Sequence, residues 1–353
     1  MSATLKAILQ FLSVSKLLDD IFRVLQSQRK GFHTYYIRDE IQSHRIDFAN
    51  DEQRANELSN TLIILQGPIC TNQNFTLDSI NRYQNYYPEC QIVLSTWIGE
   101  DQFICNDWKK RGLINENNFE VLFNKPPDSP GISNINMQII STNAGIQYGI
   151  SKKIKYVFKT RTDQAFNSPT SIDSLFNLLN CFENKDKKNR IVAFSLNTFL
   201  FRLYGVSDMA QFGTIDSIGA YWNVGLDLRS LEDIDQIEQW NENLSMYNQS
   251  RRNTCETYLM TSYLQNLGVT LGFTLKHSLE MINDYFIIAD SEFIDLTWSK
   301  YTNCGNRWRG DAFPSPYTEI SFGIWLQLHR KSDYFKSYEN LIYKSIKNGN
   351  FLN

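Results

Sequence analysis

Lys159, Arg161 and Asp163 occupy alternate positions in the stretch "YVFKTRTDQAF", residues 156–166. The apolar residues before them predict a buried strand, in which successive side chains point to opposite faces. We therefore expect these three charged side chains to share one side of the strand's carboxyl end. Cations suit phosphoryl oxygens and a carboxylate suits a divalent cation, so the stretch predicts a phosphate-and-metal site. By spacing alone, a salt-bridge cluster that only ties loops together is an equal alternative.

A second group of candidates lies in the aromatic stretch 199–223, which carries Asp208, Gln211 and Asp216. Aromatic rings stack on the C–H faces of sugars, and carboxylates and amides bond to hydroxyls, so the stretch predicts sugar recognition. Ordinary core aromatics in a loop are the alternative. Glu256 follows in the first turn of a helix predicted over 253–268, with Thr254 as its cap. It is a candidate general base for an acceptor hydroxyl, with compensation of the helix dipole as the common alternative.

The elements that would position these residues alternate along the chain. Short apolar runs predict strands, and amphipathic patterns between them predict helices. The strands are expected at 61–69, 91–100, 118–127, 154–163 and 190–196, and the helices at 76–88, 134–153 and 171–182. This alternation predicts an α/β fold with a mostly parallel central sheet flanked by helices. Ligands of such sheets bind beyond the carboxyl ends of the strands, where Gly67, Pro68, Trp97 and the stretch 159–163 fall.

The two ends of the chain differ from this central part. Residues 3–28 predict an N-terminal amphipathic helix that packs on the main body or on its twin in a homodimer. A membrane-surface helix is the alternative, which Asp19 and Asp20 weaken. Residues 40–60 are polar and read as a linker, and the C-terminal end is aromatic and basic. We divide the chain into an N-terminal extension and linker (1–58), a main domain (59–303) and a C-terminal helical extension (304–353).

Composition limits the class of protein. Hydrophobic residues make up 42% of the 353 residues, enough for a large core, and the net charge of −3 argues against a nucleic-acid partner. The six cysteines form no C-x-x-C pair, which favours reduced thiols. No apolar stretch approaches the ~20 residues of a membrane span, and no signal peptide is evident. These features predict a cytoplasmic protein, with peripheral contact at the inner face of the membrane as a further expectation.

Several blocks of the sequence together resemble the WavE family of lipopolysaccharide-synthesis proteins. They are "LIILQGPI", "FTLDSINRYQNYYPECQIVLSTWIGED", "NMQIISTNAGIQYGISKKIKYVFKTRTDQ", "YGVSDMAQFGTIDSIGAYW", "ETYLMTSYL" and "DYFIIADSEFIDLTWSKY". The resemblance covers roughly residues 60–303, and the order of the blocks is more specific than any single block. It implies a GT-A-like, Rossmann-like fold. It also implies a glycosyltransferase that moves a sugar from a nucleotide-diphosphate donor to a glycan or lipid-linked acceptor in lipopolysaccharide or surface-polysaccharide biosynthesis.

The resemblance also assigns roles around the departing diphosphate. Asp163 aligns with a strand-end acidic motif that holds Mn²⁺ or Mg²⁺ against the diphosphate. Arg161 stands where an Asp-x-Asp motif has its first Asp. This departure leaves the metal requirement open, because Arg161 is able to neutralise the diphosphate itself. Lys159 would assist Arg161, and His277 is a weaker candidate for an additional metal ligand, with a hydrogen-bonded structural histidine as the alternative.

The remaining roles concern the nucleotide and the acceptor. Gln66, Gly67 and Pro68 match the loop after the first strand, which wraps the base and ribose. Trp97 is a candidate nucleotide contact, with a core tryptophan as the alternative. Two acidic residues, Asp208 and Glu256, would orient or deprotonate the acceptor hydroxyl, and Gln211 would contact substrate near Asp208.

Two other classes of protein remain open from the sequence. A sugar nucleotidyltransferase is the first, although "LQGPICTNQN" lacks the glycine-rich phosphate loop usual in that class. A non-catalytic glycan-binding or scaffolding subunit of a polysaccharide assembly complex is the second, and the missing first Asp of the motif leaves room for it.

Overall fold

The structure is a computed structural model that describes residues 51–182, 190–229, 254–299 and 319–330. All of these residues belong to one compact unit, residues 47–353. The predicted N-terminal helix, the dimer or membrane contact assigned to it, and most of the predicted C-terminal extension lie outside the described residues.

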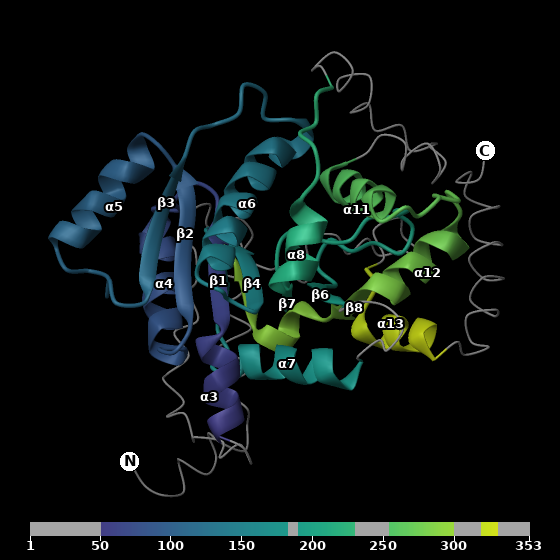
Figure 1. The fold of residues 1–353 in the computed structure, drawn as a ribbon, viewed down its shortest axis with the longest axis horizontal. Helices are drawn as coiled ribbons and strands as arrows, with labels where there is room; N and C mark the ends of the chain where they lie inside the picture. Colours follow the sequence, from purple (N-terminus) through teal and green to yellow (C-terminus); the bar gives the residue numbers. More distant parts are fainter. Residues whose placement is uncertain (1–50, 183–189, 230–253, 300–318, 331–353) are drawn as a thin grey trace, which may run out of the picture. The chain divides into compact units, whose positions relative to one another are not determined.

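The described strands form a seven-stranded central sheet in the order β3-β2-β1-β4-β7-β6-β8 (Figure 1). Its strands are β1 (Thr61–Gln66), β2 (Gln91–Trp97), β3 (Phe119–Asn124), β4 (Tyr156–Arg161), β6 (Ile191–Phe194), β7 (Gln211–Thr214) and β8 (Phe286–Ala289). The pairs β1–β2, β1–β4, β2–β3 and β6–β8 are parallel, and β7 alone runs antiparallel to its neighbours β4 and β6. A separate two-stranded ribbon pairs β5 (Gln164–Phe166) with β9 (Leu296–Trp298).

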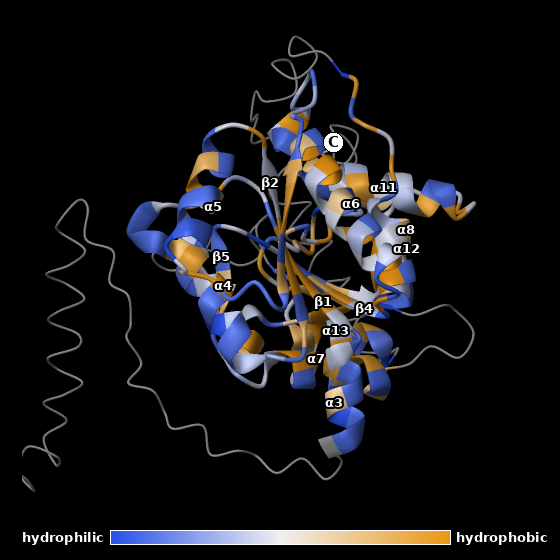
Figure 2. Cartoon of the chain, turned by 60° about the vertical axis from the view of Figure 1, so that its left-hand side comes forward, coloured by the Kyte–Doolittle hydropathy of each residue, from blue (hydrophilic) through white to orange (hydrophobic). Residues whose placement is uncertain are grey.

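Helices cover both faces of the central sheet (Figure 2). On one face lie α6 (Ile135–Ser151), α8 (Ile215–Trp222) and α11 (Cys255–Asn266). On the other lie α4 (Phe75–Tyr86) and α7 (Ser171–Cys181). The remaining α-helices are α3 (Asp51–Ser59), α5 (Glu100–Lys110) between β2 and β3, and α12 (Leu275–Tyr285) and α13 (Phe322–His329) beside β8. Single 3₁₀ turns lie at Asn72–Asn74, Ile132–Asn134 and Ser291–Ile294. The predicted α/β fold with a mostly parallel central sheet flanked by helices is confirmed.

Burial explains why the central runs form strands. Every residue of β1 is buried, and its apolar side chains belong to the same core cluster as those of β2, β4, β6 and β8. Strands covered by helices on both faces read as continuous apolar runs, as "TLIILQ" does. Figure 2 shows these strands as the hydrophobic centre, between helices in which hydrophilic and hydrophobic residues alternate.

Two features were not expected from the sequence. Residues 51–59 of the expected linker form α3, which Arg54 fastens to Asp173 of α7 through an ion pair of 2.6 Å. Residues 319–330 join the core, where Ile320 and Trp325 are fully buried.

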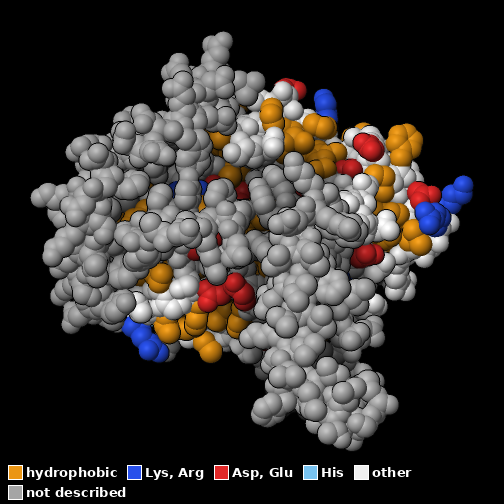
Figure 3. Space-filling model, turned by 180° about the vertical axis from the view of Figure 1, so that it is seen from behind, with side chains coloured by type: hydrophobic (Ala, Val, Ile, Leu, Met, Phe, Trp, Pro, Cys, Tyr) orange, Lys and Arg blue, Asp and Glu red, His pale blue; other side chains and the backbone are white. Residues whose placement is uncertain are grey.

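Among the described residues, no helix combines the length and the apolar character needed for a membrane span. Figure 3 shows one face, on which the described hydrophobic side chains gather in separate groups and the Lys and Arg side chains lie apart from one another.

The close approach of α6 to β1 gives a prediction for stability. A Cβ on Gly145 would meet three atoms of the buried Ile64 at 2.7, 3.0 and 3.2 Å, whereas a Cβ on Gly219 of α8 would meet only Ile146, at 3.5 Å. Overpacking costs about 1–3 kcal/mol, against a gain of roughly 1 kcal/mol from helix propensity. We expect urea unfolding to show lower stability for Gly145→Ala and unchanged or higher stability for Gly219→Ala. Equal effects of the two substitutions would contradict the observed packing.

Candidate functional site

The carboxyl ends of β1 and β4 lie side by side at one edge of the sheet, and hydrogen bonds join the segments that follow them. These strands are parallel neighbours with Gln66 opposite Arg161. Just beyond them, the backbone N–H of Thr162 donates to the carbonyl of Gln66 at 3.1 Å, and its Oγ1 donates to the carbonyl of Pro68 at 2.6 Å. Gly67 has φ of +115°, a conformation that side chains rarely adopt, and a Cβ there would lie 3.1 Å from Thr162 Oγ1. The loop after β1 is therefore held against the end of β4, as the predicted nucleotide loop requires.

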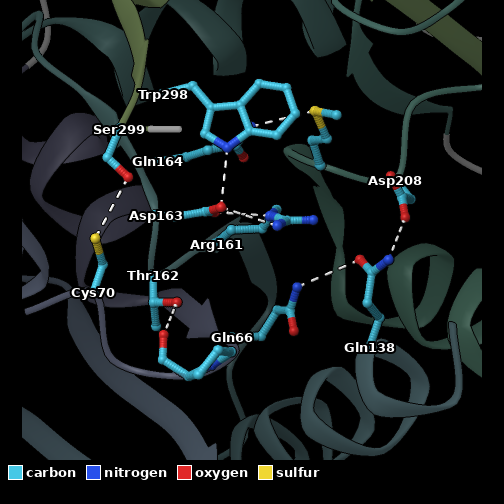
Figure 4. A network of polar contacts seen from close by, with 12 residues as sticks. Gln66, Cys70, Gln138, Arg161, Thr162, Asp163, Gln164, Asp208, Trp298 and Ser299 are labelled. Atoms are coloured by element: carbon cyan, nitrogen blue, oxygen red, sulfur yellow. Dashed lines mark hydrogen bonds and ion pairs between the residues drawn. The ribbon is translucent and has the colours of Figure 1, made fainter. Parts of the chain in front are cut away.

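Arg161 and Asp163 form a two-pronged ion pair at this edge (Figure 4). Arg161 Nε and Nη2 donate to the two carboxylate oxygens of Asp163 at 2.8 and 3.0 Å, and Trp298 Nε1 donates to Oδ2 at 3.0 Å. The side chains are 26% and 21% exposed, so solvent reaches the pair. Burial opposes ionisation of Asp163, but the hydrogen bonds and charge of Arg161 outweigh it and lower the pKa of Asp163. A fixed guanidinium–carboxylate pair thus lies within reach of solvent at the end of β4.

Lys159 takes a different position from the one predicted. It shares the α6/α8 face of β4 with Arg161, as the strand alternation predicts, but its side chain is fully buried. Its Nζ donates to the backbone carbonyls of Asp208 and Met209 and lies 4.6 Å from the ring centroid of Trp222. Burial lowers the pKa of Lys159 to about 7. Lys159 therefore anchors the loop before β7 and is not placed at the solvent-exposed edge where a phosphate ligand is needed.

Asp208 lies in that loop and is buried among polar groups. Gln138, at the start of α6, donates from Nε2 to Asp208 Oδ2 at 2.7 Å, and Gln66 donates to Gln138 Oε1 at 3.4 Å (Figure 4). Ser141 of α6 completes this chain by donating to Gln66 Oε1 at 2.8 Å. Burial, with the nearby charge of Glu256, raises the pKa of Asp208 despite the cations of Lys159 and Arg161. A carboxylate with raised proton affinity is a suitable acid–base group.

Glu256 is the second buried carboxylate, at the start of α11. It pairs with Arg202 at 3.1 Å and accepts hydrogen bonds from Asn197 and, at 3.1 Å, from the thiol of Cys255. Burial raises the proton affinity of Glu256, but the charge of Arg202 and hydrogen bonds that include the one from Cys255 outweigh it, so the pKa of Glu256 is lowered. The surroundings raise the pKa of Asp208 and lower that of Glu256. Opposite shifts of this kind are typical of carboxylates with different roles.

The described residues contain one group of three side chains with metal-ligating atoms within 4.8 Å of one another: Asp208, Cys255 and Glu256. The group does not fit Mg²⁺ or Mn²⁺, because these ions prefer oxygen ligands and the thiol is protonated, its pKa raised by burial and the two carboxylates. Asp163 and His277, the predicted metal ligands, do not belong to this group. Asp163 is bound by Arg161 and Trp298, and His277 Nδ1 lies 2.7 Å from the hydroxyl of Tyr204.

Two residues predicted to contact substrate, Gln211 and Trp97, do not lie free at this edge. Gln211 is fully buried, donates to the carbonyl of Ser207 at 3.0 Å and accepts from Trp222 Nε1 at 2.8 Å. Trp97 ends β2 and is buried, and its indole N–H has no hydrogen-bond partner among the described residues. The structure thus brings six of the predicted residues into one electrostatically connected region: Gln66, Lys159, Arg161, Asp163, Asp208 and Glu256. Gln211 supports the structure of this region through its hydrogen bonds.

Sequence analysis missed four residues that hold this region together: Gln138, Asn197, Arg202 and Trp298. Arg202 was detectable as the one cation within the run "NTFLFRLYG", because a charge in an apolar stretch needs a partner. Gln138 and Asn197 carry no such signal, since amides are common in helices and loops. Trp298 lies in a strand paired with β5 across more than a hundred residues of chain, a pairing that local patterns do not reveal.

The lowered pKa of Asp163 predicts a pH-dependent stability. Its ion pair stabilises the fold above the ordinary Asp pKa, and this stabilisation is lost as the pH falls through the lower folded value. We expect Asp163→Asn to lower the unfolding free energy by about 1 kcal/mol at pH 7, with the difference from wild type shrinking below about pH 4.

Asp107→Asn is the matched control for this experiment. It breaks the exposed Asp107–Arg111 pair, and surface pairs contribute at most about 1 kcal/mol. Urea unfolding at several pH values measures both variants. A difference for Asp163→Asn that stays constant down to pH 2 would contradict the pairing with Arg161.

Comparison with known proteins adds to this geometry. One solved structure similar to the chain is 4-diphosphocytidyl-2C-methyl-D-erythritol synthase from Anaerococcus prevotii, with 13% identity, a TM-score of 0.31, and coverage of 46% of this chain and 73% of that chain. No curated protein matches the sequence. The family described as WavE lipopolysaccharide synthesis matches residues 61–283, well over half of the chain. The matched residues include every element from β1 through α11. The chain therefore belongs to the WavE lipopolysaccharide synthesis family.

Proposed function

We propose that this protein is a glycosyltransferase that moves a sugar from a nucleotide-diphosphate donor to a glycan or lipid-linked acceptor in lipopolysaccharide or surface-polysaccharide synthesis. One observation carries the proposal: the solvent-reachable Arg161–Asp163 pair lies at the end of β4, and Gly67 and Pro68 are fastened to the same edge. Membership of the WavE family supports the biosynthetic setting. The buried carboxylate of Asp208 supplies the acid–base group that the transfer needs.

Arg161 is the proposed ligand of the diphosphate. Its guanidinium is planar and permanently charged, and its two-pronged contact with a carboxylate has the geometry that it also uses with phosphate. In the free protein that contact is filled by Asp163. Diphosphate oxygens would replace the carboxylate, and Asp163 would retain its hydrogen bond from Trp298.

The start of α4 adds to the attraction for an anion. Thr76, in its first turn, donates to the carbonyl of Thr162 at 2.9 Å and accepts from the backbone N–H of Cys70 at 2.9 Å. These contacts hold the amino terminus of α4 beside the loop after β1 and the end of β4. Helix amino termini favour negative charge, because their first N–H groups lack partners within the helix.

The transfer itself requires one bond to form and one to break. The acceptor oxygen attacks the anomeric carbon of the donor, and the bond from that carbon to the diphosphate breaks with its electron pair on the diphosphate. Arg161 stabilises the negative charge that develops there, normally a large contribution to catalysis. The proton of the acceptor hydroxyl passes to Asp208, and the products are the glycosylated acceptor and the nucleoside diphosphate.

Asp208 suits the role of base better than Glu256. Glu256 already receives the ion pair of Arg202 and hydrogen bonds from Asn197 and Cys255, and its pKa is lowered. Asp208 receives a side-chain hydrogen bond from Gln138, and its pKa is raised. Glu256 would then act on Asp208 through its charge and would not contact the acceptor.

The proposed mechanism contains no step that depends on a bound Mg²⁺ or Mn²⁺. Asp163 is the only predicted metal ligand at the edge, and its oxygens are engaged by Arg161 and Trp298. A divalent ion would need to displace one of these donors. Whether a metal is required is tested by nucleotide titration with and without Mn²⁺, and we propose a cytoplasmic location for the protein.

The nucleotide-binding part of the proposal predicts an effect of Arg161→Gln. UDP or GDP should raise the melting temperature of the wild-type protein, because a ligand of the native state stabilises it. Loss of a charge-assisted two-pronged contact, worth roughly 1.5–3 kcal/mol, should weaken binding of that nucleotide by about tenfold or more. Titration calorimetry with and without Mn²⁺ measures this loss, and Arg111→Gln on the exposed end of α5 is the control.

This experiment also separates the other candidate classes. Full engagement of Asp163 and Glu256 by protein partners favours a non-catalytic glycan-binding subunit as the second candidate, and such a subunit should show no nucleotide-dependent stabilisation. A sugar nucleotidyltransferase would form a nucleotide sugar from a nucleoside triphosphate and a sugar phosphate. Wild-type protein that binds neither UDP nor GDP would rule out the glycosyltransferase proposal.

The acid–base part of the proposal predicts the effect of Asp208→Asn. This change should lower kcat for nucleoside diphosphate release from the bound sugar nucleotide by about 10²–10⁴-fold while leaving nucleotide affinity nearly unchanged. In the wild type, activity should fall as the pH drops through the raised pKa of Asp208, and this acidic limb should be absent from the residual activity of the variant. A variant with wild-type kcat would remove Asp208 from the mechanism.

A further inference from the structure

We propose that Gln164 is a specificity-determining residue whose carboxamide hydrogen-bonds a hydroxyl of the sugar carried by the nucleotide-diphosphate donor. The inference rests on the proposed glycosyltransferase function and adds to it a residue that reads the transferred sugar.

Gln164 lies directly beside the Arg161–Asp163 pair. It begins β5, one residue after Asp163, and is paired with Trp298 of β9, whose indole bonds to Asp163. Figure 4 shows the Gln164 side chain beside the Trp298 indole and close to the pair. The ribbon of β5 and β9 therefore fixes Gln164 relative to the proposed diphosphate ligand.

The carboxamide of Gln164 is buried without adequate partners. The residue is 0% exposed, and its Oε1 has no hydrogen-bond partner among the described residues. Its Nε2 lies 3.3 Å from the sulfur of Met209, and a thioether is only a weak acceptor. Buried amides are nearly always satisfied by protein or by ordered water, so this one points to a missing hydrogen-bonding partner, either a water in the free protein or a ligand group that displaces it.

The surroundings of Gln164 identify a sugar hydroxyl as that partner. Met209 follows Asp208, and Lys159 holds the carbonyls of both residues, so this loop is fixed to β4. The charge of Arg161 acts on Asp208, where it opposes the rise in the pKa of that carboxyl. The sugar of a donor whose diphosphate binds Arg161 would lie between Gln164 and Asp208, which are both buried in the free protein, so donor binding must open a path to them. A hydroxyl both donates and accepts, as does a carboxamide, whereas a phosphate oxygen would favour a cation.

Other buried polar groups lack a hydrogen-bond partner but do not share this setting. Thr160 Oγ1 is buried on the opposite face of β4, since side chains alternate along a strand. The Tyr221 hydroxyl belongs to α8 and the Trp97 indole to the end of β2, and neither residue contacts the Arg161–Asp163 pair or Met209 through any hydrogen bond in the described part of the chain.

The test compares sugar nucleotides with their nucleotides on the full-length protein. Titration calorimetry measures binding of UDP, UDP-glucose, UDP-galactose, UDP-N-acetylglucosamine, GDP and GDP-mannose. The wild type should bind at least one sugar nucleotide more tightly than the corresponding nucleotide. Gln164→Leu should reduce this gain by about tenfold or more, because a site built to bond a hydroxyl loses that bond, and should leave UDP or GDP affinity within about twofold.

Two further variants keep the test decisive. Gln164→Met retains the length of the side chain without its amide, and it replaces the Leu variant if that one has a reduced melting temperature. Thr160→Val removes another buried, unpartnered polar atom and should leave both affinities unchanged.

The outcomes distinguish this inference from the function on which it rests. A wild type that binds neither UDP nor GDP contradicts the glycosyltransferase proposal and the inference together. A wild type that binds a nucleotide overturns the role of Gln164 alone in any of three cases: no sugar nucleotide binds more tightly, the variants keep the full gain, or they lose affinity for nucleotide and sugar nucleotide equally. The last result would mean that Gln164 only supports the fold.

Discussion

The site depends on the neutralisation of charge in a poorly solvated part of the protein. Three cations and three carboxylates meet where β1 and β4 end: Lys159, Arg161 and Arg202 with Asp163, Asp208 and Glu256. A buried charge without a partner costs several kcal/mol, by general estimates of the desolvation penalty. Each of these side chains therefore restricts where the others lie. The loops that carry them gain a defined position even though they are not part of the sheet.

This restriction explains how distant parts of the chain meet. Lys159 on β4 holds the carbonyls of residues 208 and 209, and Arg202 holds Glu256 at the start of α11. The Arg161–Asp163 pair binds Trp298 of β9. The sheet supplies a rigid edge, and hydrogen bonds of Lys159 and Asp163 attach the loop before β7 and strand β9 to it. The Arg202–Glu256 ion pair joins the loop before β7 to α11. A change of charge at one of these positions should therefore affect both the local fold and the chemistry.

The sequence predicts five of the seven strands of the central sheet, β1 to β4 and β6, because most of them are nearly continuous apolar runs, which are typical of strands covered on both faces. It does not predict β7 and β8. Strand alternation also places Lys159 and Arg161 on one face, as expected. It does not reveal how deep each side chain lies: one position along β4 separates a buried lysine from the partly exposed end of the strand. Burial depends on α8 and on the loop before β7, which contact β4 only through long-range packing. The same reason hides Gln138, Asn197 and Trp298, whose importance comes from their partners and not from their own pattern.

If Arg161 stands where an Asp-x-Asp motif has its first carboxylate, as the resemblance to the family implies, this edge differs from such a motif before any ligand binds. Two carboxylates at such spacing repel each other and need a bound cation, so the motif is incomplete without a metal. With Arg161 in that place, the charge of Asp163 is balanced within the protein, and the guanidinium is already oriented. In the proposed mechanism, an incoming diphosphate competes with Asp163 for Arg161, so the ion pair that stabilises the free protein must weaken for the donor to bind. Part of the binding free energy would then be used to open the pair, and anions too weak to displace the carboxylate would not bind there.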